Sequence, residues 1–153
     1  MIPAPKPGLV FRYEYLWKRQ SALGQETAEK ERPACIVLAV HQEHGETRVL
    51  IVPITHSAPA ADTALEIPSR VKHHLGLDAS RSWIVLSEAN IDHWPSPDMR
   101  HIPGNPGQFG YGLLPKGMVD RMRRMIMESL NEGSLKMVDR IEAPVTERPK
   151  RQP

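Results

Sequence analysis

The chain has 153 residues, a net charge of +2, one cysteine and fifteen prolines. Its length predicts one domain that folds without disulfides or metal, and so many prolines argue against a helical bundle because each lacks a backbone donor. No segment approaches the roughly 20 apolar residues that cross a bilayer, and residues 1–8 lack the apolar core of a signal peptide. We therefore expect a soluble, cytoplasmic protein that does not contact a membrane.

The first half of the chain predicts strands separated by one long loop. Residues 7–17 alternate with a period close to two, which indicates a strand. Residues 18–31 are polar and lack periodicity, so we expect a long charged loop. Residues 32–42 and 47–57 are apolar runs joined by a glycine-containing turn, which predicts an antiparallel hairpin. The first of these runs is apolar on both sides, like a central strand, and residues 64–67 predict one more short strand.

The second half of the chain adds two helices. Residues 68–77 predict a helix of one to two turns that ends at Gly76, and residues 82–92 predict another buried strand. Residues 93–112 are dense in proline and glycine and predict an irregular excursion. Residues 114–133 form the clearest helix. Its apolar positions recur every three or four residues and favour core packing over a partner groove: Met118, Val119, Met122, Met125, Ile126 and Leu130.

These elements predict a mainly-β, β-rich α+β fold. We expect a small, strongly bent antiparallel barrel or half-open sheet, with a short inserted helix and a C-terminal helix. Residues 1–142 should form this single domain, and the composition of residues 143–153 is typical of a disordered tail. Cys35 lies in an apolar run without charged neighbours, which favours a small core residue over a reactive thiol.

Two strand ends carry polar side chains that suit chemistry. Arg32 stands immediately before the run PACIVLAV, and Thr55 directly follows VLIVPI. If the two strands pair through the turn near Gly45, Arg32 and Thr55 become neighbours at one end of the sheet. A guanidinium beside a hydroxyl suits a phosphate. The alternative is an ordinary surface ion pair between Arg32 and Glu31 or Glu88.

The histidines and glycines do not indicate a cofactor. His41 and His44 lie in a turn, and His73 and His74 lie in the predicted short helix, without a cysteine partner or an H-E-x-x-H pattern. We therefore expect exposed histidines and no metal. No glycine-rich loop opens a helix, so the sequence supports neither a P-loop nor a dinucleotide fold.

Basic residues gather in clusters at Lys18 and Arg19, at residues 121–124, and in the C-terminal tail. Each cluster taken alone is typical of a solvated surface.

The order of these elements resembles the MazF/PemK family of toxin endoribonucleases. The likeness runs through PGLVFRYEY, a charged loop, ERPACIVLAV, RVLIVPITHS, HLGLDASRSWIVLSEA and GYGLLPKGMVDRM, and it covers about Pro7 to Leu130. The R-P-x-x-x-V element and the P-I-T-H/S element are moderately specific together and weak apart. The resemblance implies an SH3-like barrel, a homodimer, and cleavage of single-stranded RNA without a metal.

The resemblance also implies partners and site residues. The arginine of the R-P element corresponds to Arg32 and the threonine of the P-I-T element to Thr55, which are the expected catalytic residues. The loop over the RNA corresponds to Lys18–Glu31. A cognate antitoxin protein would neutralise the toxin, and DNA would be contacted only indirectly, through that antitoxin. The expected RNA-binding residues are Lys18, Arg19, Ser57, Glu88 and Asn90.

The sequence departs from the family in the segment LSEANIDHW. Many members read like D-Q-I-R there, whereas this chain has Glu88 and Asn90 at the aligned positions, which implies a different RNA preference. Metal-free cleavage needs a base for the 2′-hydroxyl proton and donors for the charge on the phosphate. Strand alternation points His56 away from Thr55, so Glu88 or a group not yet identified ranks above His56 as the base.

Two other functions fit the same sequence. One is a non-catalytic barrel that acts by binding a protein, as the gyrase-poisoning toxin CcdB does, because fold does not fix function. The other is a member of the family that binds RNA without cutting it.

Overall fold

The computed structural model describes residues 2–24, 30–59 and 63–141. The expected tail, residues 143–153, lies outside these ranges. The elements in chain order are β1 (Leu9–Tyr13), α1 (Lys18–Ala22), β2 (Arg32–His41), β3 (Thr47–Thr55), β4 (Ala64–Glu66), α2 (Ser69–Leu75), β5 (Trp83–Val85), β6 (Glu88–His93), β7 (Gly110–Leu113), α3 (Lys116–Glu132) and β8 (Lys136–Asp139).

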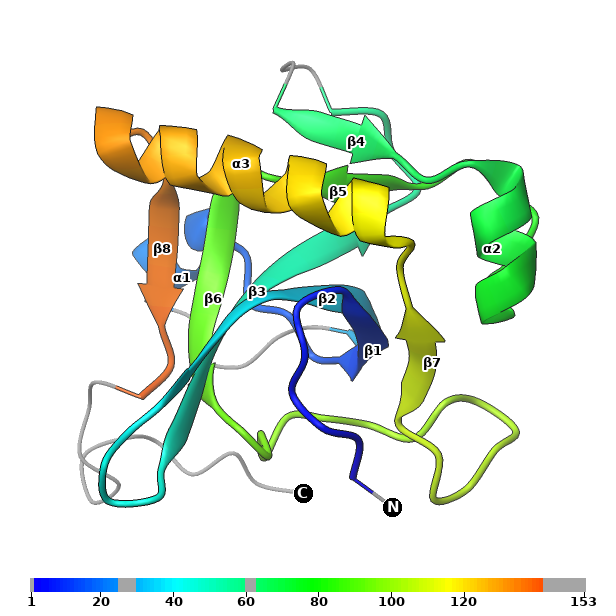
Figure 1. Ribbon diagram of the computed structural model, residues 1–153, viewed down its shortest axis with the longest axis horizontal. Coiled ribbons are helices and arrows are strands. Elements are labelled where there is room, and N and C mark those ends of the chain that lie inside the picture. The colour runs from blue at the N-terminus through cyan, green and yellow to red at the C-terminus, as the bar shows by residue number, and fades with distance from the viewer. Residues whose placement is uncertain (1, 25–29, 60–62, 142–153) are drawn as a thin grey trace.

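The fold is mainly β, with a curled antiparallel sheet that forms a half-barrel, a short helix and a longer C-terminal helix (Figure 1). The strand order is β4-β5-β3-β2-β1-β7. One edge of β3 pairs with two strands in turn, because its first part pairs with β6 and its last two residues pair with β5. The C-terminal strand β8 extends the sheet by pairing in parallel with β6. The mainly-β α+β class is therefore confirmed.

Strands β1 to β3 bury side chains on both faces, and for β2 the apolar run predicted this. Along β2, Cys35 and Val37 pack into one cluster while Ala34 and Ile36 pack into the other. The first cluster lies under α3, and the second contains Phe11 and further aromatic side chains of β1 and the segment after it. Since β2 lies between β1 and β3, this double burial matches a central strand.

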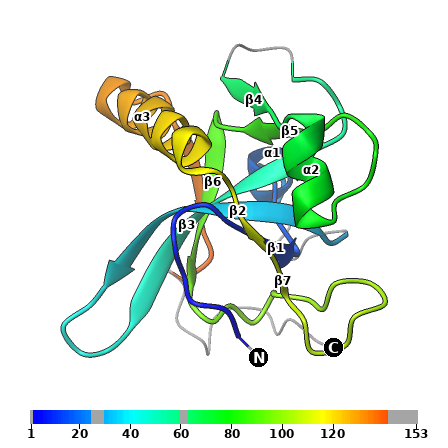
Figure 2. The same cartoon turned by 45° about the vertical axis from the view of Figure 1, so that its right-hand side comes forward.

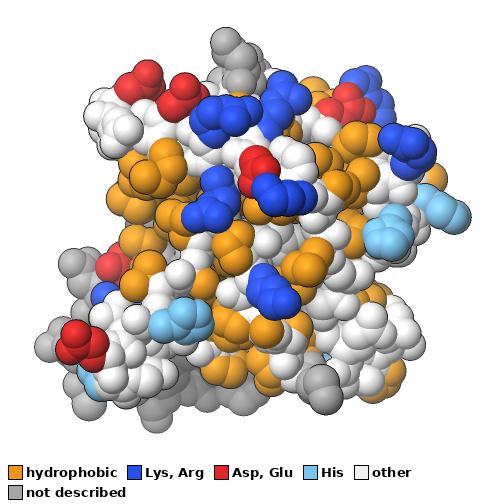
Figure 3. Space-filling model, in the orientation of Figure 1, with side chains coloured by type: hydrophobic (Ala, Val, Ile, Leu, Met, Phe, Trp, Pro, Cys, Tyr) orange, Lys and Arg blue, Asp and Glu red, His pale blue; other side chains and the backbone are white. Residues whose placement is uncertain are grey.

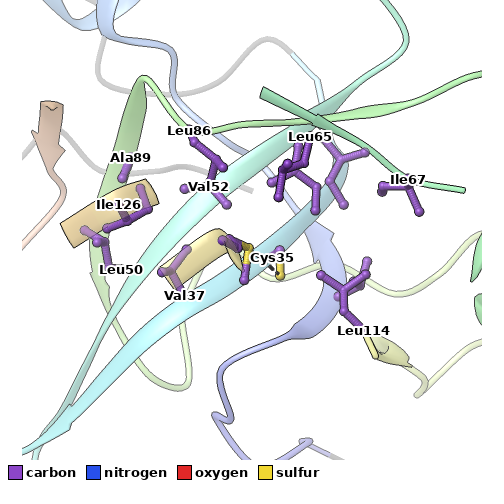
Figure 4. Packing of buried hydrophobic residues seen from close by; sticks show 14 of the residues in the cluster. Cys35, Val37, Leu50, Val52, Leu65, Ile67, Leu86, Ala89, Leu114 and Ile126 are labelled. Carbon is purple, nitrogen blue, oxygen red and sulfur yellow. Dashed lines mark hydrogen bonds between the residues drawn. The ribbon is translucent and has the colours of Figure 1, made fainter. Parts of the chain in front are cut away.

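Helix α3 covers the first cluster with its methionine stripe. Met122 and Ile126 are fully buried, and the sulfur of Met122 lies 3.9 Å from the sulfur of Cys35. Figure 4 shows Ile126 of this helix beside Leu50 in the same cluster. Burial raises the pKa of the Cys35 thiol. The stripe and Cys35 are therefore core residues, as predicted. The helix ends at Gly133, whose φ of 72° is the left-handed conformation that favours glycine at this position.

The long loop expected over Lys18–Glu31 begins instead as a helix, α1. Its five residues are too few to show a helical period. Tertiary contacts hold it in place, because the backbone N–H of Lys18 donates to the Glu88 carboxylate and the Lys18 ammonium to the carbonyl of Met137. Residues 25–29 of this segment lie outside the described ranges.

The segment predicted as one strand over residues 82–92 forms two strands, β5 and β6. The first pairs with the last residues of β3, and the second pairs with residues near its start. The irregular segment predicted over residues 93–112 ends in strand β7, which pairs with β1. Gly112 of this strand has a φ of 133°. Strand β8 was not predicted from the sequence. No helix in the described ranges is long and apolar enough to cross a membrane.

Candidate functional site

The N-terminal end of β2 meets the C-terminal end of β3, as the hairpin predicted. The pairing of the two strands ends with Ala34 and Pro53, and Arg32 and Thr55 lie two residues beyond that pair, at the same end of the sheet. Both residues line a cavity of about 480 Å³, which we name the first cavity. Its walls come from the segment before α1, from α1, from the ends of β2 and β3, and from the β5–β6 connection: Tyr15, Trp17, Arg19, Gln20, Lys30, Arg32, Thr55, Ser57, Ala58, Pro59, Val85, Ser87 and Glu88.

Arg32 is a half-buried cation without a carboxylate partner in the described part of the chain. Its Nε atom is buried and makes no hydrogen bond there. The expected alternative, an ion pair with Glu31 or Glu88, does not form: Glu31 accepts from Arg12 at 3.0 Å, and Glu88 accepts from other groups. Burial lowers the pKa of Arg32, and the nearby charges of Arg19 and Arg12 lower it further. An anion entering the first cavity would relieve this repulsion.

The ring of Trp17 makes cation–π contacts with Arg19 and Arg32. The guanidinium carbon of Arg32 lies 5.0 Å from the centre of the Trp17 ring, and that of Arg19 lies 5.3 Å from it. These distances are typical of cation–π contacts. Trp17 therefore holds two positive charges on the wall of the first cavity. Lys30 adds a third, exposed positive charge.

The hydroxyl groups come from the polar end of β3. The Oγ1 atom of Thr55 accepts a hydrogen bond of 3.2 Å from the backbone N–H of Ser57. Its own proton has no recorded acceptor among the described residues, so the hydroxyl can still donate to a ligand in the cavity. Ser57 lines the same cavity and is exposed. The strand thus presents two hydroxyls next to Arg32.

Glu88 contributes the carboxylate of the first cavity. Its Oε1 atom accepts hydrogen bonds from the Tyr15 hydroxyl at 3.1 Å and from the backbone N–H of Lys18 at 2.8 Å. Within the described residues its Oε2 atom has no recorded partner, so it remains able to accept a proton. Burial raises the pKa of Tyr15, and the negative charge of Glu88 adds to that rise.

His56 points away from this cavity, as strand alternation predicted. It lines a second cavity, and its Nε2 atom lies 2.8 Å from the Oδ2 atom of Asp78. A hydrogen bond from Lys72 is the main cause that lowers the pKa of Asp78, with the positive charge of a protonated His56 as a further cause.

Two of the expected RNA-binding residues do not line the first cavity. Asn90 is fully buried, and its amide exchanges hydrogen bonds with the backbone of Leu16 and accepts one from Arg140. The comparison with the family motif did not indicate that Asn90 is buried. Because it is buried, its side chain stabilises the fold and does not face the cavity. Lys18 lies beside the cavity but directs its ammonium to Met137. Arg19, Arg32, Thr55, Ser57 and Glu88 do line the cavity together.

Several wall residues were missed from the sequence, namely Tyr15, Trp17, Gln20, Lys30 and Ser87. The period of two along residues 7–17 places Tyr15 and Trp17 on the same side, so that alternation could have identified them. The basic cluster on α3 is a separate, exposed surface: Figure 3 shows Lys and Arg side chains gathered over this helix, whereas α1 lies behind the sheet in the same view of Figure 1.

The histidines considered as metal ligands are dispersed. His41, His44, His73 and His74 are all exposed. Over the described ranges, no group of three or more His, Cys, Asp or Glu side chains is arranged to hold a metal ion.

Comparison of the chain with protein-family models finds no match, and comparison with curated proteins finds none either. The likeness to the MazF/PemK family therefore stays a prediction from the sequence motifs.

Proposed function

We propose that the protein is a toxin endoribonuclease of the MazF/PemK kind, which cleaves single-stranded RNA in the first cavity. The observation that carries the proposal is the half-buried Arg32, which lines a cavity together with Thr55 and has no carboxylate partner within the described residues. Burying a cation without a partner is unfavourable, so such a group is retained where an anion binds. A guanidinium is planar and donates two parallel hydrogen bonds, which suits two oxygens of a phosphate.

Aromatic and cationic walls suit a single strand of RNA better than a small phosphate. Unpaired bases stack on aromatic rings, and the cations follow the backbone. Trp17 supplies a partly exposed ring, while Arg19 and Lys30 add positive charge to the same cavity as Arg32. The whole set therefore resembles a platform for a nucleotide chain.

The cleavage step that these residues support begins with the 2′-hydroxyl of the RNA. Its oxygen attacks the adjacent phosphorus while its proton passes to the Oε2 atom of Glu88. Arg32 and the Thr55 hydroxyl donate hydrogen bonds to the phosphate oxygens, on which negative charge increases. The 5′-oxygen leaves with a proton from solvent, and the products are a 2′,3′-cyclic phosphate and a 5′-hydroxyl end. No cofactor is needed for this step.

The direct test is to incubate the purified protein with a long single-stranded RNA in the presence of EDTA. We expect the wild type to cut the RNA and Arg32→Ala to leave it intact. Arg121→Ala is a matched control, because it removes an exposed arginine of α3 that lies outside the cavity. Intact RNA with the wild type would exclude the nuclease, and so would equal cutting by Arg32→Ala.

A fluorescence titration with the same RNA separates the neighbouring functions. Binding without cutting would favour a protein that only binds RNA, and absence of both would favour action on a protein partner. A cognate antitoxin and a homodimer belong to this proposal as well. Size-exclusion chromatography with light scattering tests the dimer.

A further inference from the structure

A second cavity of about 370 Å³ lies on the other side of the residues at the start of β2. Lys30 and Arg32 line both cavities, so these two residues form the edge that the cavities share. Strand alternation explains the division, because Thr55 faces the first cavity while Ile54 and His56 face the second. The outer wall comes from α2 and the turn after it, and from β7, which lies beside α2 in Figure 2.

A chain of hydrogen bonds fixes the imidazole of His56 in this second cavity. Asp78 holds its Nε2 atom at 2.8 Å, and the other carboxylate oxygen of Asp78 accepts from the Lys72 ammonium at 2.7 Å. Lys72 is itself buried and donates to the hydroxyl of Ser82 at 2.6 Å and to the carbonyl of Ser80. Because a carboxylate only accepts, the neutral ring of His56 carries its proton on Nε2 and offers Nδ1 as an acceptor.

Apolar side chains form the walls around this fixed imidazole. Ile54 and Ile102 are buried, and Pro33, Leu77 and Pro103 complete the apolar lining. A cavity with apolar walls and a few oriented polar groups is typical of a site for a flat organic group. A nucleobase has this character, with an apolar face and a polar edge.

The charges of the second cavity are uneven. Arg12 is paired with Glu31 at 3.0 Å, and Lys72 is paired with Asp78. Lys30 and Arg32 have no recorded carboxylate partner among the described residues, so the unpaired positive charge lies on the shared edge between the cavities. The phosphate of a nucleotide is therefore favoured on that edge, and the base of the same nucleotide would lie in one of the two cavities.

We propose that the second cavity is a base-recognition pocket for the nucleotide next to the cleaved linkage. The phosphate of that nucleotide lies on Lys30 and Arg32, its base enters between Ile54 and Leu77, and Nδ1 of His56 accepts a hydrogen bond from the edge of the base. This inference rests on the proposed function for its biological role, and it assigns His56 to RNA selectivity and not to the chemical step.

Binding of single nucleotides tests the pocket without relying on cleavage. Each of the four nucleoside 3′-monophosphates is titrated into the full-length protein, with inorganic phosphate for comparison, and the His56 ring signals are followed by NMR. We expect one nucleotide to bind at least about tenfold more tightly than phosphate and to shift these signals. His56→Ala should lose on the order of tenfold in affinity for it, as for one lost hydrogen bond. His74→Ala, an exposed histidine of α2 outside the cavity, should bind it like the wild type.

Unfolding midpoints confirm that His56→Ala is folded, which is expected because the side chain is 58% exposed. The pocket is refuted if no nucleotide binds more tightly than phosphate, or if His56→Ala binds the preferred nucleotide like the wild type.

Sequencing the ends of cleaved RNA then links the pocket to the proposed function. We expect the wild type to prefer one base at a fixed position beside the cut, and His56→Ala to lose that preference at that position alone. If the wild type does not cut RNA, the nuclease fails while the nucleotide titration still decides the pocket. An unchanged cut-site preference in His56→Ala would overturn the role of His56 in selectivity.

Discussion

Two arginines of this protein lie in opposite situations. Arg32 opens into the first cavity and has no carboxylate partner within the described ranges. Arg140 follows β8 and is buried, and it donates to Asp98 at 2.7 Å, to the Tyr13 hydroxyl at 3.2 Å and to Asn90 at 3.1 Å. Burial lowers the pKa of Arg32, whereas surrounding negative groups leave the pKa of Arg140 raised despite its burial.

The two arginines therefore have different expected roles: Arg140 stabilises the fold, and Arg32 binds a ligand. Arg140 belongs to a closed network in which Asp92 also accepts from Tyr13 at 2.8 Å and from Ser96 at 2.7 Å. Its charge is satisfied by the protein itself, so it stabilises the native state. Among the described residues, Arg32 has no carboxylate that neutralises its charge, and under the proposed function the RNA phosphate takes that place. Removing the first arginine should therefore damage activity, and removing the second should damage stability.

The largest expected effect is that of Arg140→Met on stability. The substitution leaves buried carboxylates without their cation, which costs about 3–5 kcal/mol in comparable buried pairs. Chemical denaturation measures the loss. Asp120→Asn, which breaks an exposed pair with Lys116 on α3, is the matched control and should leave the unfolding curve nearly unchanged. A loss below about 1 kcal/mol for Arg140→Met would mean that the network contributes little.

Arg32→Ala should show the reverse pattern. RNA cleavage should fall by about 10²–10³-fold, the loss typical of removing one preorganised donor to a developing negative charge. The free energy of unfolding should stay the same or rise, because the variant removes a partly buried charge that has no carboxylate partner among the described residues. Initial cleavage rates and denaturation curves of the same preparation provide both values. Loss of activity together with a clear loss of stability would contradict the comparison.

The closed network should also respond to pH through Asp98. Burial raises the pKa of Asp98 from 3.8 to about 6, and the charge of Arg140 opposes that rise. Between these two values the native state holds the proton more tightly than the unfolded chain does. The contribution of Asp98 to stability is therefore complete below about pH 4 and is lost as the pH rises through 6. Denaturation of the wild type and Asp98→Asn from pH 4 to 8 checks this. The stability of the wild type relative to the variant should decline over that range, and a constant difference would argue against it.

The smallest expected effect is that of Thr55→Val in the first cavity. The variant keeps the shape of the side chain but loses one hydrogen bond to the phosphate, so cleavage should fall on the order of tenfold. Its unfolding should change little, because Thr55 is only half-buried. Steady-state rates on a short RNA measure the change. If Thr55→Val cuts as fast as the wild type, the hydroxyl has no part in the reaction.

The presence of Arg32 and Thr55 at the same end of the sheet could be predicted from the sequence because a short turn fixes the register of one hairpin. Alternation along the same strand also predicted that His56 faces the other way. These inferences depend only on residues that are near one another in the chain. The core assignment of Met122 likewise followed from the helical period, and that of Cys35 from its place in an apolar run without charged neighbours.

The remaining features depend on residues that are distant in sequence. Helix α1 is held by Glu88, and Asn90 is buried by its contacts with Leu16 and Arg140. Strand β8 pairs in parallel with β6, and no pattern in the sequence near β8 predicts this pairing. The second cavity also escaped prediction, since its walls combine α2, β7 and the ends of β1, β2 and β3.

The contact between Arg140 and Tyr13, which spans 127 residues, has a consequence for the order of events during synthesis. Translation produces Tyr13, Asn90, Asp92 and Asp98 before the cation that joins them. Until Arg140 emerges, burial of the two carboxylates lacks the cation that offsets part of its cost, so we expect closure of β1 and β6 around them to be less favourable. Contacts so distant in sequence are slow to form. A ribosome paused before Arg140 would therefore carry a chain whose hairpin β2–β3 can form while the half-barrel around it stays open.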